Sequence, residues 1–364
     1  MARNIIKRSN AIVGVQHSTG AFTTGQYSLN LYNIVQDWNY SIALPRQNLK
    51  QVGTQDVIAR EFFNQPDVEL GFAYIPEPSF FNETNGRFLG PVLPTFAPVN
   101  MFSGALEMST NFYVFVTPNE QDDVLPSIQA GAPNNLSGFN VIAFGNCFPT
   151  TYGLSYSVGA LPMVSTNYIC SNVVFENVTG TSMDLPAINL TGGNNDGRGI
   201  SVFNFGAGIG IKDGKNPIIV NPTDTGSSIS LQNLQVGGQN LSGVHYVQSL
   251  DMSVDLSRVS SYGLGNDFAY GREAQLPAQG TFSVTSLVSG MDSGVLTGVL
   301  DNDSNYNFEL ALQASGKKLI YQIEDAKLNS YNYGMSLNQN MTFDASFSFN
   351  VTETRGLKLS GTSY

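Results

Sequence analysis

Apolar and polar residues alternate along several stretches of the chain, most regularly in residues 37–44, which read DWNYSIAL. The even-numbered positions of this stretch are apolar, and the odd-numbered positions are polar or small. A period of two predicts a β-strand with one buried side and one solvent-facing side. The same alternation returns 212 residues later in residues 249–256, SLDMSVDL, so the chain carries one strand pattern twice.

Other alternating stretches predict further strands, and no stretch predicts a long helix. The predicted strands are residues 68–74, 111–116, 139–148, 152–158 and 167–175. The connection formed by residues 46–65 is polar and unusually long, and residues 56–63 within it fit a short helix or an extended arm. Connections of this length are usually functional. The predicted fold class is all-β, with two tandem sandwich-like or barrel-like domains and at most short helices.

The repeat extends well beyond one strand. Residues 35–61 and residues 247–273 align without gaps and are identical at eight of 27 positions. A second echo relates residues 151–158 to residues 330–337 at an offset of 179. The two offsets differ by 33 residues, which predicts an insertion of that size in the first copy, within about 75–140. Tandem duplication of one β-domain is the simplest account.

A glycine-dense stretch, residues 192–216, separates the two copies. It predicts a linker between a first domain, residues 1–191, and a second domain, residues 217–364. The first domain opens with a mildly basic arm over residues 1–26. The linker contains Lys215 beside glycines, but Asn216 and Pro217 follow it, so it lacks the Ser/Thr and the helix that a phosphate-binding loop requires.

The composition points to a covered or weakly charged surface. Charged residues make up 12% of the chain, against roughly 25% in ordinary soluble proteins. Burial in an assembly and a Thr/Ser-rich monomeric β-protein both fit this composition. The formal net charge of −11 disfavours tight binding to a phosphate backbone, but it is compatible with nucleic acid that passes without adhering.

The search for catalytic or metal chemistry is negative. The chain has two histidines and two cysteines in four separate places, without the spacing of a zinc site. Cys147 and Cys170 are interpreted as reduced, partly buried thiols. No GxSxG motif occurs. No apolar run is long enough to span a membrane, and no signal peptide is recognisable. The sequence predicts no enzyme, no cofactor and no membrane association.

The order of these features resembles the tail tube proteins of tailed bacteriophages. The resemblance rests on residues 35–57, residues 66–74 and residues 140–159, together with their echoes in the second half. It implies a virion protein whose β-sandwich domains form rings that stack into a tube for genome delivery. A duplicated member is expected to form trimeric rings with pseudo-sixfold symmetry. Its expected partners are further copies of itself, other tail proteins (terminator, tip or baseplate, tape measure) and DNA in transit. Assembly is expected in the host cytoplasm, and the insertion is expected to decorate the outside of the tube.

The resemblance also assigns roles to particular residues. The polar sides of the strands that flank the long loops are expected to line the channel, at Asp37, Asn39, Ser41, Glu69, Asp251, Ser253, Asp255, Thr281 and Ser283. The loops themselves are expected to contact the neighbouring ring, through Arg46, Arg60, Glu61, Arg258, Arg272 and Glu273. Solvent-facing strand positions without a channel are the plainer interpretation of the first set.

Two other functions fit the same sequence features. Another virion component, such as a collar or capsid decoration protein, shares the low charge and the β-rich pattern. A carbohydrate-binding β-sandwich module or hydrolase is the alternative from a different class, with Trp38 and exposed tyrosines as a sugar platform. Trp38 alternates with apolar neighbours on the predicted buried side, which favours a place in the core.

Overall fold

The structure is a computed structural model that describes most of the predicted strands. The described residues are 11–17, 28–32, 35–53, 56–62, 67–76, 80–89, 98–103, 109–116, 140–157, 160–177, 187–188, 228–232, 235–236, 239–240, 247–261, 269, 271–287, 305–314, 317–335 and 340–361. The predicted linker, residues 192–216, lies outside them.

Strands dominate the described residues, and the all-β prediction is confirmed. The strands of the first part are β1 (Ala11–His17), β2 (Ser28–Leu31), β3 (Val35–Ala43), β4 (Arg46–Lys50), β5 (Val57–Phe62), β6 (Asp67–Tyr74), β7 (Val99–Asn100), β8 (Thr110–Val116), β9 (Asn140–Ser157), β10 (Met163–Cys170), β11 (Asn172–Asn177) and β12 (Ala187–Ile188). Those of the second part are β13 (Ser228–Gln232), β14 (Gln235–Val236), β15 (Gln239–Asn240), β16 (Val247–Asp255), β17 (Arg258–Ser261), β18 (Gly271–Ala274), β19 (Ala278–Leu287), β20 (Tyr306–Ala314), β21 (Lys317–Gly334), β22 (Thr342–Val351) and β23 (Leu357–Gly361). The helix that the structure describes, α1 (Phe81–Asn85), is five residues long.

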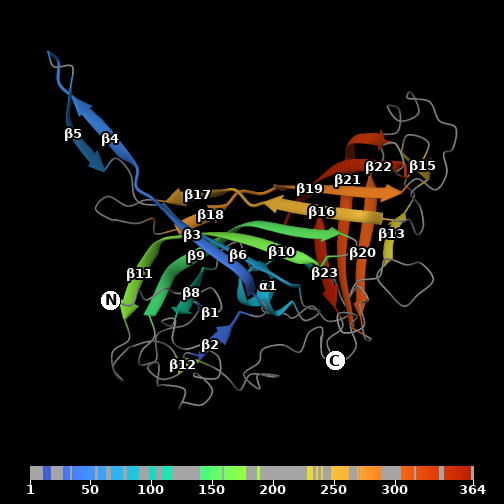
Figure 1. Cartoon of the computed structure of the whole chain (residues 1–364), viewed down its shortest axis with the longest axis horizontal. Coiled ribbons are helices and arrows are strands. Elements are labelled where there is room, and N and C mark those ends of the chain that lie inside the picture. The colour runs from blue at the N-terminus through green and yellow to red at the C-terminus, as the bar shows by residue number, and fades with distance from the viewer. Residues whose placement is uncertain are drawn as a thin grey trace.

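Eight strands form one continuous antiparallel sheet, here called the central sheet (Figure 1). Its order is β3, β6, β10, β9, β16, β19, β22 and β21. The first four strands come from the first half of the sequence and the last four from the second half. They meet where β9 pairs with β16, between Thr151–Ser157 and Ser249–Asp255. The two halves therefore share backbone hydrogen bonds.

Two smaller sheets cover one side of the central sheet. The first contains β2, β1, β8, β9 and β11, and the second contains β13, β20, β21, β23 and β7. The long strands β9 and β21 belong to the central sheet and to a smaller sheet at once. Each turns between the two at a residue with positive φ, Asn146 (φ 48°) and Asp325 (φ 57°). Asn and Asp tolerate this left-handed conformation better than most residues.

The two halves follow the same pairing scheme, down to their irregularities. The β3–β6 pair has a register shift after Val35, and the β16–β19 pair has one after Val247, 212 residues later. The turning residues Asn146 and Asp325 are 179 apart. Matching register shifts also occur in the β8–β9 and β20–β21 pairs, where the positions on β9 and β21 are again 179 apart. These offsets equal those found in the sequence.

Aromatic side chains fill the space between the central sheet and each smaller sheet. In the first half the ring of Phe112 lies 5.0 Å from Phe72 and 4.7 Å from Tyr168. In the second half Phe308 lies 4.9 Å from Phe282 and 4.7 Å from Phe347. Each aromatic side chain buries a large apolar area, so these clusters contribute strongly to stability.

Most residues of the insertion that the structure describes are buried, although Pro98 and Ser103 are exposed. Phe80, Phe88 and Met101 are fully buried, and the ring of Phe80 packs edge-on against Tyr321 of the second half at 5.9 Å. Strand β7 extends the second smaller sheet by pairing with β23. The expectation that the insertion decorates the outside is therefore wrong for these residues, because their apolar side chains fill the space between the halves. The acidic residues 120–123 lie outside the described residues.

Strand pairing decides two smaller predictions. Residues 11–17 are not a free arm, because β1 pairs with β8 along its whole length. Of the two alternatives for residues 56–63, a short helix or an extended arm, the structure shows the extended one, because β5 (Val57–Phe62) pairs with β4 in a hairpin. Both segments satisfy their backbone groups across a sheet, which propensity within a short window does not reveal.

Candidate functional site: the polar face of the central sheet

The side of the central sheet that faces away from the smaller sheets is polar. One row across it shows the pattern, with each residue the cross-strand partner of the next: Asp37, Ala73, Ser165, Gly153, Ser253, Thr281 and Ser348. Strand alternation places the apolar neighbours of these residues on the opposite side, in the core. Two halves of the chain thus build one continuous polar surface, here called the polar face.

All nine residues predicted to line a channel lie on this face. Cross-strand pairing joins them, as in Ser41–Glu69, Asp251–Ser283 and Ser253–Thr281. Asp37 is half-buried and the other eight are exposed. The sequence analysis missed further members on β9, β10 and β22, among them Ser155, Ser165 and Ser346. Each of these serines directly follows a buried residue, Leu154, Val164 or Ala345. This alternation along the strand is the sequence signal that could have located them.

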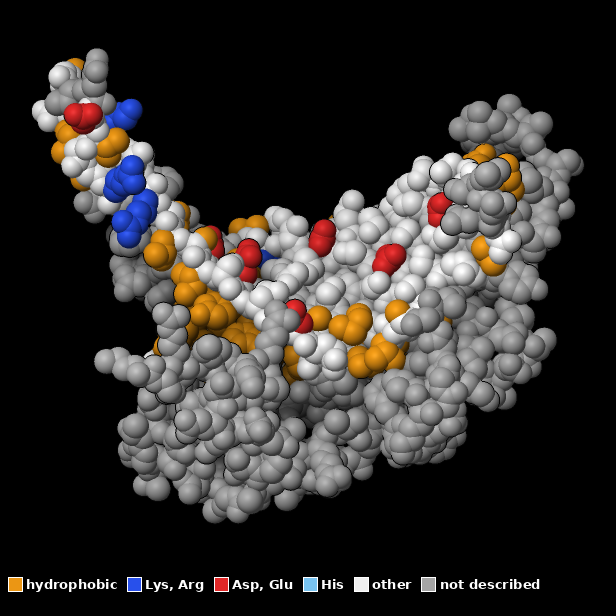
Figure 2. Space-filling model, in the orientation of Figure 1, with side chains coloured by type: hydrophobic (Ala, Val, Ile, Leu, Met, Phe, Trp, Pro, Cys, Tyr) orange, Lys and Arg blue, Asp and Glu red, His pale blue; other side chains and the backbone are white. Residues whose placement is uncertain are grey.

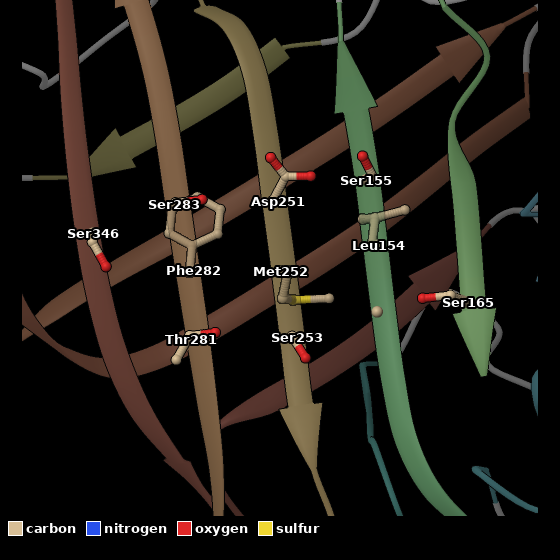
Figure 3. A pocket seen from close by; sticks show the side chains of 11 residues that line it. Leu154, Ser155, Ser165, Asp251, Met252, Ser253, Thr281, Phe282, Ser283 and Ser346 are labelled. Atoms are coloured by element: carbon tan, nitrogen blue, oxygen red, sulfur yellow. The ribbon is translucent and has the colours of Figure 1, made fainter. Parts of the chain in front are cut away.

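The polar face is hollowed near its middle. A hollow of about 490 Å³ lies over β10, β9, β16, β19 and β22. Its polar lining consists of Ser155, Ser165, Asp251, Ser253, Thr281, Ser283 and Ser346, which Figure 3 shows on neighbouring strands. Gly153 adds no side chain to the bottom of the hollow. A Cβ atom at this position would come within 2.6 Å of the Ser165 hydroxyl. No group of residues suited to hold a metal ion occurs in the described part of the chain.

The electrostatic character of this face is acidic. Figure 2 shows acidic side chains scattered over the hollowed side of the molecule. Strand alternation places Asp251 and Asp255 of β16 and Asp344 of β22 on this face. The Asp344 carboxylate accepts a hydrogen bond of 2.6 Å from Thr285. The seven strands β3, β6, β9, β10, β16, β19 and β22 contain no Lys, Arg or His. On the eighth strand, β21, Lys327 is the cross-strand partner of Ser348. Over the other seven strands the face carries carboxylates and hydroxyls without basic groups, and such a surface repels phosphate.

The two outer strands of the central sheet end in unpaired edges. In the described part of the chain, β3 pairs only with β6, and the last eight residues of β21 pair only with β22. The prediction that the apolar side of residues 37–44 is buried is partly wrong for the single chain. Tyr40, Ile42 and Leu44 are 38%, 41% and 50% exposed. Their neighbour Trp38 is half-buried and packs against the core, as its pattern predicted. At the other edge Met335 is 80% exposed.

The counterpart of β3 in the second half has no such exposure. Leu250, Met252, Val254 and Leu256 of β16 and the following turn are all at most 3% exposed. The difference has a simple cause, because β16 lies between β9 and β19 while β3 has a neighbour on one side only. Exposed apolar residues on an unpaired strand mark a surface for pairing with another chain.

Two hairpins extend from the same end of the central sheet. The β4–β5 hairpin projects away from the sheets, as Figure 1 shows, and it carries exposed Arg46 and Arg60. The β17–β18 hairpin carries Arg258, Arg272 and exposed Glu273. The side chain of Glu61 lies outside the described residues.

The arginines of the second hairpin contact their own chain. Arg258 donates to the backbone carbonyl of Pro149 at 2.8 Å, and its guanidinium lies 5.2 Å from the ring centre of Phe148. Arg272 is 4% exposed and donates to the carbonyl of Cys170 at 3.4 Å. Burial lowers the pKa of Arg258 to about 10, with a further contribution from the neighbouring Arg272. These contacts hold the β17–β18 hairpin against β9 and β10.

The comparisons with known proteins add little. No protein-family model and no curated protein matches the sequence. One solved structure, the tail of an empty GTA particle with C6 symmetry, aligns with 37% of this chain and 95% of its own chain. The sequence identity is 14% and the TM-score is 0.24. A score this low does not establish a shared fold. Separately, no helix in the described part of the chain is long and apolar enough to cross a membrane.

Proposed function

We propose that this chain is a non-enzymatic structural protein, the subunit of a phage-type tail tube, and that three copies close into a ring around a channel. The single observation that carries the proposal is the geometry of the central sheet. Its two unpaired edge strands, β3 and β21, correspond by the repeat to β16 and β9. These are the two strands that pair where the halves of the chain meet. The resemblance of the sequence to tail tube proteins agrees with this geometry.

The internal joint supplies a template for the joint between copies. Inside the chain, β9 pairs with β16, and the apolar residues on both strands are buried. The offsets of 212 and 179 give β3 the position of β16 and β21 the position of β9. Applied to the internal register, they predict the pairs Asn39–Gly334, Tyr40–Tyr333, Ser41–Asn332, Ile42–Tyr331 and Ala43–Ser330 between one copy and the next.

Ring closure explains why the edges are apolar. An open sheet edge with exposed apolar residues invites uncontrolled aggregation, and closing a sheet into a barrel abolishes its edges. Each copy contributes eight strands, arranged as two similar sets of four. Three copies would therefore give a closed barrel with sixfold pseudo-symmetry, as the resemblance implies for a duplicated member.

The polar face would then form the wall of the channel. The carboxylates of Asp37, Asp251 and Asp255 and the hydroxyls of Ser253 and Thr281 would face passing DNA. Seven of the eight strands carry no basic residue that would bind its phosphates. Stacked rings would make the tube, with the terminator, tip or baseplate and tape measure proteins as its partners. The proposed location is the virion tail, after assembly in the host cytoplasm.

Electron microscopy of the purified protein tests this function. At high concentration the protein should form hollow tubes. Ile42→Lys should stop tube formation and leave a folded subunit, because Ile42 is exposed in the single chain but buried in the proposed joint. Val259→Lys is the matched control, since Val259 is 49% exposed and lies outside that joint. A protein that stays monomeric at high concentration, or tubes that form equally well from Ile42→Lys, would contradict the proposal.

A further inference from the structure

The β4–β5 and β17–β18 hairpins are built alike but placed differently. In the first, Arg46 pairs with Phe62 and Asn48 with Arg60. In the second, Arg258 pairs with Ala274 and Ser260 with Arg272. Adding 212 to each residue of the first hairpin gives its counterpart in the second. The registers are the same, yet one hairpin projects from the molecule and the other lies on it (Figure 1).

The docked hairpin shows which face makes contact. Arg258 and Arg272 are on one face, and each donates a hydrogen bond to a backbone carbonyl, of Pro149 and Cys170 respectively. A further bond of 2.9 Å runs from Arg258 to the carbonyl of Arg272 and ties the hairpin together. Glu273 is on the other face and is exposed. These hydrogen bonds join arginine to main-chain oxygen and do not depend on the side chains of the surface beneath, whereas the contact of Arg258 with the ring of Phe148 does.

The projecting hairpin carries similar polar residues at exposed positions. Arg46, Asn48 and Arg60 occupy the positions of the docked face, and all three are exposed. Lys50 adds a further positive charge to this hairpin. Ile58, near its tip, is 57% exposed. A basic hairpin with exposed apolar residues on a chain of net charge −11 is a surface suited to an acidic partner.

A matching seat exists in the second half of the chain. The offset of 179 places Leu328 at the position of Pro149 and Phe349 at that of Cys170. Local geometry agrees, since the β9–β10 and β21–β22 pairs have register shifts at corresponding places. The seat differs in charge from its counterpart at two positions, since Asp325 stands where the first half has Asn146 and Lys327 stands where it has Phe148.

The seat lies at the edge that the neighbouring copy would use. In the chain, β17 follows β16 directly and docks across the strand beside β16, which is β9. By the same geometry β4, which follows β3, would reach across the strand beside β3. In the proposed ring that strand is β21 of the next copy.

We propose that the β4–β5 hairpin of one copy docks on the seat formed by β21 and β22 of the next copy in the same ring, with Arg60 donating to the carbonyl of Phe349 and Arg46 to that of Leu328. This inference rests on the proposed ring. It also replaces the expected role of Arg46 and Arg60, which the resemblance placed between stacked rings. The hairpin would thus add side-chain contacts between neighbouring copies to the backbone hydrogen bonds between β3 and β21.

Cysteine cross-linking in assembled tubes tests the docking. Asn48 lies beside Arg60 on the docking face, and Asn350 follows Phe349 at the seat; both are exposed. The double variant Asn48→Cys/Asn350→Cys is treated with a short bis-maleimide after assembly. The native Cys147 and Cys170 are fully buried and should not react. Gln47→Cys/Asn350→Cys is the control, since Gln47 is on the opposite face of the hairpin.

Docking within the ring should give covalent dimers and trimers and nothing larger, because three links close the ring. Adding Arg60→Ala should slow the cross-linking about tenfold, the loss expected for one charge-assisted hydrogen bond. Covalent species beyond the trimer would place the hairpin between rings and overturn the inference. Tubes without cross-links would overturn it too, while leaving the proposed function intact. If the unmodified protein forms no tubes, the proposed function itself fails.

Discussion

The hydroxyl groups of Tyr152 and Tyr321 lie 3.1 Å apart and are fully buried, although the two residues belong to different halves of the chain. Glu83 of the insertion completes this link, because it accepts hydrogen bonds from Tyr152 at 3.2 Å and from Tyr74 at 3.0 Å. Burial raises the pKa of Glu83 from 4.5 to about 7, and the hydrogen bonds offset only part of that effect. The insertion thus places a titratable carboxyl between the halves.

Glu83 should make the stability of the subunit depend on pH. Its pKa is higher in the folded chain than in the unfolded chain, so the folded state binds the proton more tightly. The resulting stabilisation is fully present below about pH 4.5 and is lost as the pH rises through 7, by about 3 kcal/mol in total. Glu83→Gln stays neutral and retains an acceptor for both tyrosines. We expect its unfolding free energy to vary less between about pH 5 and pH 8.

Denaturant unfolding below the concentration of assembly measures this effect. Above pH 7 the Glu83→Gln variant should be more stable than the unmodified protein. Asp251→Asn, which neutralises an exposed carboxylate, should keep the original pH dependence. An unchanged slope in Glu83→Gln would show that Glu83 does not titrate in this range.

Arg258→Ala should release the β17–β18 hairpin. The substitution removes two hydrogen bonds, to the carbonyls of Pro149 and Arg272, and the contact with the ring of Phe148. We expect a loss of about 2 kcal/mol in unfolding free energy and faster amide exchange in β17 and β18. Val259→Ala is the control, because Val259 is exposed on the opposite face. Unchanged exchange in Arg258→Ala would mean that other contacts hold the hairpin.

Several strands were predictable because they carry their own alternation, whereas β1 was expected to be part of a free arm. Residues 37–44 and 249–256 show a period of two that is visible in the local sequence alone. The gap-free repeat also shows which residue of the first strand corresponds to which residue of the second. The polar face followed from the same period, since every second residue of a strand shares a side. What remained hidden is which strands lie next to each other.

The pairing of β9 with β16 illustrates the limit. Nothing in residues 151–157 specifies that their partner is 249–255 rather than the same segment of another chain. The burial of Val254 and the exposure of its counterpart Ile42 depend on that choice alone. Glu83 was overlooked for a similar reason, because its setting is made by tyrosines 9 and 69 residues away. Contacts of this kind are properties of the topology.

Gly280 should be intolerant of a side chain. The ring of its cross-strand partner Phe349 lies directly over it, and a Cβ atom there would come within 2.3 Å of that ring. Gly280→Ala should therefore displace Phe349 and cost about 1–3 kcal/mol, as overpacking of a core usually does. Gly271→Ala is the control, because nothing lies within 4 Å of the added atom. The two variants should differ clearly in denaturant midpoint, and equal midpoints would contradict the packing described for Phe349.

Reversing charge on the polar face should make the tube retain DNA. Asp251 and Asp255 are exposed on β16, and no basic residue occurs on the strands around them. The double variant Asp251→Lys/Asp255→Lys places positive charge where the proposed channel is acidic. Lysines that contact phosphates release counterions, so binding should weaken steeply with salt. Co-sedimentation of tubes with short linear duplex DNA, over a series of salt concentrations, measures this. Glu273→Lys adds positive charge on a hairpin away from the polar face and should leave DNA in the supernatant. If the double variant retains no more DNA than Glu273→Lys, the polar face does not line the channel.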